Sequence, residues 1–275
     1  MRCVVRGLMA VGSGVAIAQA VEWMFSKWGV QVACGWIMSL AVVAAIGLFF
    51  VQGYFVEGFL LRRAKIELRG IGMQIGVYKG DLFAQDGVIV IPVNDFFDTL
   101  VDDVHIAKKS LHGLAVQKYW AANVLDLDNR IDEELLGMPF EAVERDGWAK
   151  EKRYPCGTSV FLKDDNGRKL IFVALTHTDA KTHVTSARIE DLVAAVRGAL
   201  CVARERASGA AISFPLMGSG NSRIKLPHQA LFDTILSTII AECNDAKVSE
   251  KINIVLRGHL ADRLNFANLK DLWEA

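Results

Sequence analysis

The sequence of 275 residues has no excess charge of either sign, because 31 Lys and Arg residues balance 31 Asp and Glu residues. Proteins that bind duplex nucleic acid through its phosphates normally present a basic surface, so we expect no nucleic-acid partner. The five cysteines form no C-x-x-C motif, and no histidine stands at metal-ligand spacing from them. We therefore predict reduced thiols in a cytosolic compartment and no metal site.

Charge is especially scarce at the N-terminus. Residues 1–61 contain only five charged side chains, whereas charges occur at ordinary density from residue 62 onward. This contrast predicts a membrane segment over residues 1–61 and a folded domain over residues 62–275. The size of the second part suits one α/β domain with a full hydrophobic core.

Two apolar runs in the first part are long enough to cross a bilayer. Residues 7–25 would form a helix about 28 Å long, close to the hydrocarbon thickness of about 30 Å, and residues 30–56 carry no charge. The short connection between them predicts a transmembrane hairpin. Basic residues precede the first run and follow the second, so the positive-inside rule places the N-terminus and the folded domain in the cytoplasm.

Small residues in the first run leave two kinds of helix contact open. Ala10, Gly14 and Ala18 recur on one helical stripe, which lets helix backbones approach closely in lipid. That contact can lie within the hairpin or between protomers. A cleaved signal peptide is the other interpretation of this run, but the run is long for one and a second span follows directly.

The second part alternates strand and helix patterns and predicts a three-layer α/β/α domain with a mixed sheet. Residues 158–175 predict a hairpin around an Asp-Asn-Gly turn. Residues 126–155 are charged and irregular, with Gly137, Pro139 and Gly147 as breakers. The remaining expected strands lie at residues 65–70, 73–80, 87–94, 210–217 and 251–257; the expected helices lie within 98–122 and 185–206, from Pro227, and at the C-terminus.

A glycine-rich stretch, FPLMGSGNSR at residues 214–223, follows one of these strands. A Walker A loop needs a lysine after its last glycine, and this sequence has none there. The dinucleotide fingerprint needs a third glycine where Arg223 stands, and it normally follows the first strand of its domain. Two interpretations remain: a concavity of backbone N–H groups that binds an anion, and a structural turn.

Two segments of the sequence, taken together, resemble a known domain family. The stretch YKGDLFAQDGVIVIPVNDFFDT (residues 78–99), combined with residues 214–223, resembles the macro domain, a module that binds ADP-ribose and its derivatives. The resemblance implies that Asp81, with Leu82 beside it, accepts a hydrogen bond from the adenine amino group, and that Asn94 faces the distal ribose. It also implies that the diphosphate is held by Gly218, Ser219, Gly220 and Asn221.

Further candidates surround these positions, each with a plainer alternative. Asp81 is also a common turn residue, and Asp98 either caps a helix or meets a ribose hydroxyl or a cationic amine. The Thr99 hydroxyl suits a phosphate neighbour. Arg223 can pair two phosphate oxygens or form a surface ion pair, and Lys181 can meet a carboxylate on the ligand.

The resemblance extends to essentially the whole chain. The stretch FFDTLVDDVHIAKKSLHG (residues 96–113) and residues 214–223, behind two apolar runs, are similar to the macro-domain effectors of Thoeris antiphage defence. The resemblance implies a TIR-domain partner that makes an ADP-ribose-type signal, reported as a histidine conjugate. It implies a homo-oligomer in the bacterial inner membrane, where signal binding leads to membrane damage, and it implies no cofactor.

The function could also be enzymatic. Macro domains that hydrolyse ADP-ribose adducts often carry small residues after the strand that ends at Asn94, and here NDFFDT replaces them with phenylalanines and acids. This departure favours a receptor without catalytic residues. The alternatives are a membrane-anchored hydrolase acting on ADP-ribosylated substrates and a membrane scaffold in which the glycine-rich stretch is only a turn.

Overall fold

This computed structural model describes residues 34–53, 63–145, 149–257 and 260, with isolated residues 16, 19, 20, 23 and 27. The chain divides into two compact units, and the boundary in the sequence lies after Ala64. The second unit spans Lys65–Ala261.

The N-terminal unit contains α2, Cys34–Val51, whose 18 residues carry no charge. This helix lies inside the apolar run predicted at residues 30–56. The run predicted at residues 7–25 falls almost entirely outside the described residues. Across the described ranges, no helix combines the length and the apolar character that a bilayer crossing needs. The transmembrane hairpin is therefore not found here and stays a prediction from the sequence.

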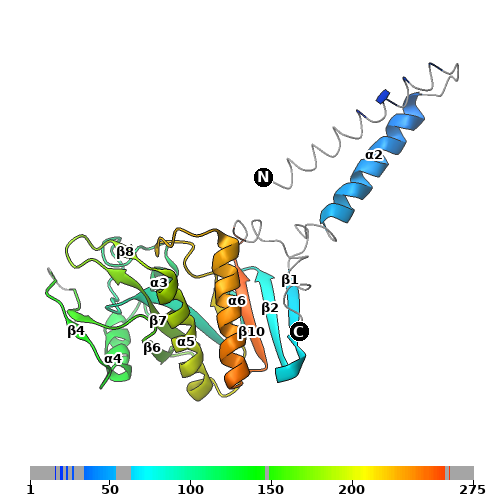
Figure 1. The fold of residues 1–275 in the computed structure, drawn as a ribbon. Coiled ribbons are helices and arrows are strands. Elements are labelled where there is room, and N and C mark those ends of the chain that lie inside the picture. The colour runs from blue at the N-terminus through cyan, green and yellow to red at the C-terminus, as the bar shows by residue number, and fades with distance from the viewer. Residues whose placement is uncertain are drawn as a thin grey trace. The chain divides into compact units, whose positions relative to one another are not determined.

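The second unit is built on a mixed sheet with strand order β1-β2-β10-β9-β3-β7-β6, and β8 pairs with β7 (Figure 1). β10 pairs in parallel with β2 and β9, and β3 pairs in parallel with β9 and β7. β6 and β8 run antiparallel to β7. The strands are β1 (Arg63–Leu68), β2 (Met73–Lys79), β3 (Val88–Asn94), β6 (Ser159–Lys163), β7 (Lys169–Thr178), β8 (Thr185–Ser186), β9 (Ile212–Pro215) and β10 (Lys251–Leu256).

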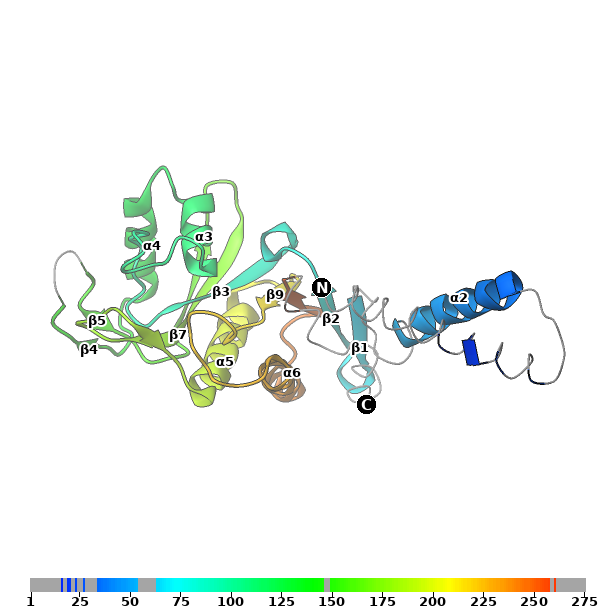
Figure 2. The ribbon, with the colours of Figure 1, turned by 90° about the horizontal axis from the view of Figure 1, so that it is seen from above.

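Helices cover both faces of this sheet. Figure 2 shows α3 and α4 on one face and α5 and α6 on the other, which confirms the predicted α/β/α layering. A separate antiparallel pair is formed by β4 (Glu141–Ala142) and β5 (Lys152–Arg153). The helices are α3 (Leu111–Tyr119), α4 (Val124–Glu134), α5 (Ile189–Arg206) and α6 (His228–Asp245), with 3-10 turns η2 (Arg69–Ile71) and η3 (Leu82–Ala84).

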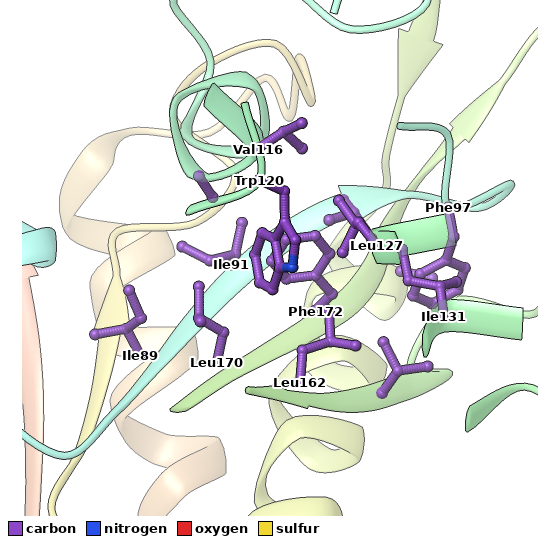
Figure 3. Close-up of a cluster of buried hydrophobic side chains, with 14 of the residues drawn as sticks. Ile89, Ile91, Phe97, Val116, Trp120, Leu127, Ile131, Leu162, Leu170 and Phe172 are labelled. Carbon is purple, nitrogen blue, oxygen red and sulfur yellow. The ribbon is translucent and has the colours of Figure 1, made fainter. Parts of the chain in front are cut away.

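The core beneath α3 and α4 is centred on aromatic side chains (Figure 3). Trp120 stands edge-on to Phe172 of β7, with ring centroids 5.9 Å apart. Ile91 of β3 and Leu127 of α4 are fully buried beside them. Successive strand residues point to opposite faces, so the β-branched run of β3 supplies apolar side chains to both layers. This packing fixes the sheet whose edge forms the candidate site.

The helix predicted within residues 98–122 is much shorter than expected. It begins only at Leu111, where Ser110 caps it by accepting a hydrogen bond from the Gly113 N–H at 2.9 Å. Before that, the Asp102 carboxylate accepts hydrogen bonds from backbone N–H groups, and Asp103 adopts a positive φ of 68°. These local bonds compete with helix formation, so residues 98–110 form a loop.

The charged segment from residue 126 is more regular than expected. α4 begins at Val124 and is capped by Asn123, whose side chain accepts a hydrogen bond from the Asp126 N–H at 3.1 Å. Leu127 and Ile131, four residues apart, are buried on one face. The prediction of irregular structure was wrong for residues 126–134. Two apolar side chains on one face are enough to stabilise this short helix, because they pack against the sheet.

The other predicted elements are confirmed with small shifts. Residues 158–175 form the hairpin of β6 and β7, and α6 begins directly after Pro227. α5 begins at Ile189 instead of residue 185, because Thr185 and Ser186 pair with β7 as β8. The expected C-terminal helix lies outside the described residues.

Candidate ligand-binding site

A cleft of about 270 Å³ opens at the carboxyl ends of the parallel strands. It is lined by the last residues of β3, by residues at or after the ends of β2, β9 and β10, by Leu175 and Thr176 of β7, and by part of the 105–112 segment. Because these strands run parallel, their carboxyl ends meet along one edge of the sheet, which is where open α/β sheets bind ligands. The cleft is therefore the candidate functional site.

Seven of the residues predicted from the sequence come together here from three strand ends. Asp81 and Leu82 follow β2, Asn94 ends β3, and the glycine-rich stretch follows β9. The seven lining residues are Asp81, Leu82, Asn94, Gly218, Ser219, Gly220 and Asn221. Their roles as ligand contacts stay predictions.

Asp81 is exposed at the start of η3. Its Oδ1 accepts a hydrogen bond from the Phe83 N–H at 3.0 Å, and its backbone oxygen accepts one from the Gln85 side chain at 3.0 Å. These contacts fix the direction of the carboxylate. Within the described part of the chain Oδ2 has no hydrogen-bond donor, so it can accept one from a ligand.

The glycine-rich stretch presents unpaired backbone donors to the cleft. Among the described residues, the N–H groups of residues 218–222 have no hydrogen-bond acceptor. Gly218 adopts a φ of +86°, where a side chain would be strained, and an added Cβ would lie 3.0 Å from Ile224. Consecutive free N–H groups in such a turn form an anion-binding concavity, which suits a phosphate.

This loop is held in place by the segment that precedes α5. The Thr185 hydroxyl donates to the Asn221 carbonyl at 3.0 Å, and the Ala187 N–H donates to the Ser222 carbonyl at 2.8 Å. The Ser219 hydroxyl donates to the Leu216 carbonyl at 2.9 Å. The Asn221 and Ser222 carbonyl groups are thus used internally, which fixes the end of the loop against the segment before α5.

Asp98 does not line the cleft, because its carboxylate is committed elsewhere. It forms a bidentate, buried ion pair with Arg145, at 2.9 and 3.0 Å. The Asn94 side chain donates to Asp98 Oδ2 at 2.8 Å and accepts from the Asp98 N–H at 3.1 Å. The Asn94 side chain is therefore bound to Asp98 through both of its polar atoms.

Three other predicted contacts also lie away from the cleft lining. The Thr99 hydroxyl donates to Asp128 at 2.8 Å. Lys181 is exposed in the loop after β7, and Arg223 is exposed with a positive φ of 54°, its N–H bonded to the Gly220 carbonyl. Arg223 closes the turn through its backbone, and that turn leaves its side chain out of the lining.

Sequence reasoning missed several lining residues that come from the 105–112 segment and from the end of β10. Lys109 and Arg257 bring positive charge, and neither forms a salt bridge within the described residues. Asp81 is the one carboxylate among the described lining residues. The cleft therefore favours an anionic ligand, although the chain as a whole is neutral.

Two histidines of the 105–112 segment place ring nitrogens at the cleft. His105 Nδ1 lies 2.8 Å from Asp102 Oδ2, and its ring packs on His183 with centroids 4.8 Å apart. His112 is buried against Phe172 and hydrogen-bonds to the backbone of Asp98. The Nε2 atoms of both are buried without a partner among the described residues, which is uncommon for a buried polar atom.

The pKa values of His112 and Asp102 are both lowered, which favours a neutral imidazole at His112 and an ionised carboxylate at Asp102. Burial lowers the pKa of His112 to about 4, so this ring is neutral near pH 7. Burial tends to raise the pKa of Asp102, but hydrogen bonds from the His105 ring and from backbone N–H groups outweigh it and lower the pKa to about 2. Asp102 is therefore ionised and orients His105 at neutral pH.

His112 predicts a measurable pH dependence of stability. The unfolded chain protonates this histidine below its ordinary pKa of about 6.5, but the folded chain does so only near 4. Between these values the free energy of unfolding should fall by about 1.4 kcal/mol for each pH unit of acidification. Urea unfolding of wild type and His112→Asn at several pH values measures this slope. His183→Asn is the control, and an unchanged slope in His112→Asn would contradict the assignment.

Comparison with known proteins agrees with this architecture. The family described as "Thoeris protein ThsA, Macro domain" matches residues 75–257, about two thirds of the chain. Thoeris protein ThsA of Bacillus amyloliquefaciens (strain Y2) is 24% identical over 240 residues, covering 84% of this chain and 78% of that protein. The Oceanobacillus iheyensis macrodomain with ADP has a TM-score of 0.53 and 17% identity, covering 77% of this chain and 95% of that chain. The chain therefore belongs to the Thoeris ThsA macro domain family.

Proposed function

We propose that this protein is a Thoeris defence receptor whose cleft binds an ADP-ribose-derived signal nucleotide. One observation carries the proposal: the loop of residues 218–222, whose N–H groups have no acceptor among the described residues, lines the same cleft as Asp81. The first suits a diphosphate and the second suits an amino group that donates a hydrogen bond. The similar Oceanobacillus iheyensis macrodomain is described with ADP, which contains both groups.

The diphosphate is placed in this proposal at the glycine-rich loop. Its oxygens accept hydrogen bonds from the N–H groups of residues 218–222, and Lys109 and Arg257 balance its negative charge. Asp98, the acid that would repel it, is neutralised by Arg145 outside the lining. The distribution of charge thus favours an anion over a neutral sugar.

The distal ribose and any group attached to it are placed near the 105–112 segment. His112 is neutral at pH 7, and its Nδ1–H donates to the Asp98 backbone, so its Nε2 can accept a hydrogen bond from a ribose hydroxyl. His105 Nε2 lies in the same wall of the cleft. The Asn94 side chain is held by Asp98 through both of its polar atoms, so we assign it the task of positioning Asp98 and the loop that follows.

A receptor fits these contacts better than a hydrolase. An ADP-ribosyl hydrolase needs a base or a positioned water near the distal ribose. The side chains that would serve after β3, Asn94 and Asp98, are bound to each other and to Arg145. We therefore propose ligand binding without turnover, and no catalytic residue.

The remaining parts of the proposal follow from the Thoeris relationship and the sequence. A TIR-domain partner makes the signal, and the two proteins communicate only through this small molecule. Residues 7–25 and 30–56 anchor a homo-oligomer in the bacterial inner membrane, with the macro domain in the cytoplasm. Signal binding drives assembly and membrane damage only if its affinity differs between resting and assembled states.

Gly220 offers a test of the phosphate site that spares the fold. An added Cβ at Gly220 meets no heavy atom within 4 Å, so Gly220→Val should fold and place its side chain at the cleft. We expect calorimetry to show ADP-ribose, or its histidine conjugate, binding at least about tenfold more weakly. Gly70→Val, at an equally open position outside the cleft, should bind as wild type does. Equal affinity in Gly220→Val, or no heat with wild type, would exclude the proposed site.

Asp81 tests the adenine assignment. Removing one hydrogen bond to a charged group costs about 1.5–3 kcal/mol, so Asp81→Ala should weaken ADP-ribose binding by roughly tenfold to a hundredfold. The same variant should bind ribose 5-phosphate, which lacks adenine, as wild type does. Asp86→Ala removes a neighbouring exposed carboxylate outside the cleft and serves as the control. Equal losses for both ligands would contradict an adenine contact.

A further inference from the structure

Cys156, His177 and Asp191 form a cluster that is separate from the cleft lining. Cys156 lies before β6, His177 lies near the end of β7, and Asp191 lies in the first turn of α5. Cys156 Sγ is 3.5 Å from His177 Nε2, and Nε2 is 3.3 Å from Asp191 Oδ1. One ligand atom from each residue lies within 4.8 Å of the other two.

We propose that this cluster binds a zinc ion. The sequence predicted no metal site, because these three residues are far apart in the chain and have no metal-ligand spacing. Thiolate sulfur, imidazole nitrogen and carboxylate oxygen are the three donor types that zinc uses in proteins. At zinc bond lengths, a tetrahedral ion separates sulfur and nitrogen ligands by about 3.5 Å and nitrogen and oxygen ligands by about 3.4 Å. The Cys156–His177 and His177–Asp191 separations agree with these values, and the Cys156 sulfur lies within 4.8 Å of the Asp191 oxygen, so an ion can be held with only small side-chain movements.

A buried carboxylate orients the histidine for this role. His177 Nδ1 lies 3.3 Å from Asp95 Oδ2, and the Asp95 side chain has no exposed surface. Asp95 is fixed in turn by the Thr178 N–H at 3.0 Å and by Arg153. A carboxylate that accepts from Nδ1 directs the lone pair of Nε2 toward the metal, which is the usual arrangement behind a zinc-bound histidine.

The other two ligands are also held by their local structure. Asp191 Oδ2 accepts a hydrogen bond from the Arg188 N–H at 2.7 Å, which turns Oδ1 toward His177. Gly157, next to Cys156, packs so closely on α5 that an added Cβ would lie 2.7 Å from the Ala194 carbonyl oxygen. This contact fixes the Cys156 backbone beside the first turns of α5.

The negative charges near Cys156 favour a bound cation and disfavour a free, nucleophilic thiolate. Burial, together with the Asp191 and Asp95 carboxylates, raises the pKa of the Cys156 thiol to about 12. The thiol is therefore protonated near pH 7 and weakly nucleophilic. Zinc binding releases this proton to solvent and forms the Zn–S bond, while the two carboxylates offset the charge of the ion.

The site keeps one position open. The His177 side chain is 47% exposed, and three protein ligands leave the fourth tetrahedral position to water. The ion joins the segment before β6, the end of β7 and α5, which are separate in the sequence. It therefore ties one face of the sheet to its covering helix.

Metal analysis of the full-length protein tests the proposal. After chelator treatment, reloading with zinc and dialysis, we expect about one zinc per chain in wild type. Cys156→Ser and His177→Gln should retain almost none. Cys201→Ser, at an exposed cysteine of α5 outside the cluster, should retain as much as wild type. Asp95→Asn should bind zinc about 10-fold to 100-fold more weakly.

A second measurement keeps the test decisive if a variant fails to fold. In wild type, zinc should protect Cys156 from alkylation by iodoacetamide, as read by peptide mass spectrometry, and leave Cys201 unprotected. Cobalt in place of zinc should give a thiolate charge-transfer band. Wild type retaining no more zinc than Cys156→Ser would overturn the proposal. Rapid alkylation of Cys156 that zinc does not slow would overturn it too and would indicate a nucleophilic cysteine.

Discussion

The carboxyl ends of β2, β10, β9, β3 and β7 lie along one edge of the sheet because these strands pair in parallel. Everything that the candidate site contains depends on this alignment. It brings the Gly80–Asp81 turn, the end of β3 and the glycine-rich loop together, although they are far apart in the sequence. The packing of α3 and α4 on one face and α5 on the other holds the edge rigid, so the loops can leave N–H groups unpaired.

A second constraint acts within the loop after β3. The buried pair of Asp98 and Arg145 leaves neither charge unpartnered, which is essential because an uncompensated buried charge is costly. The same pair removes a carboxylate from the neighbourhood of the cleft, and Lys109 and Arg257 then dominate its charge. One arrangement thus stabilises the loop and leaves the described cleft lining with more positive than negative side chains.

The sequence predicted the strands and turns whose signals come from residues close together in the chain. The β-branched run of β3, the hairpin at residues 158–175 and the loop after β9 are signalled by residues that are neighbours in the chain. The pairing of Asp98 with Arg145, 47 residues away, has no local signal, so Asp98 was expected at the ligand. Likewise, the side-chain bonds of Asp102 delay the start of the predicted helix to Leu111 and leave His105 in the loop that lines the cleft, where the sequence alone did not place it.

The account rests on the claim that the loop after β9 holds a diphosphate. A crystal structure of the full chain or its macro domain with ADP-ribose measures this most directly. We predict phosphate oxygens within hydrogen-bond distance of the N–H groups of residues 218–222, and adenine near Asp81. A diphosphate bound away from this loop, with those N–H groups still free, would contradict the claim.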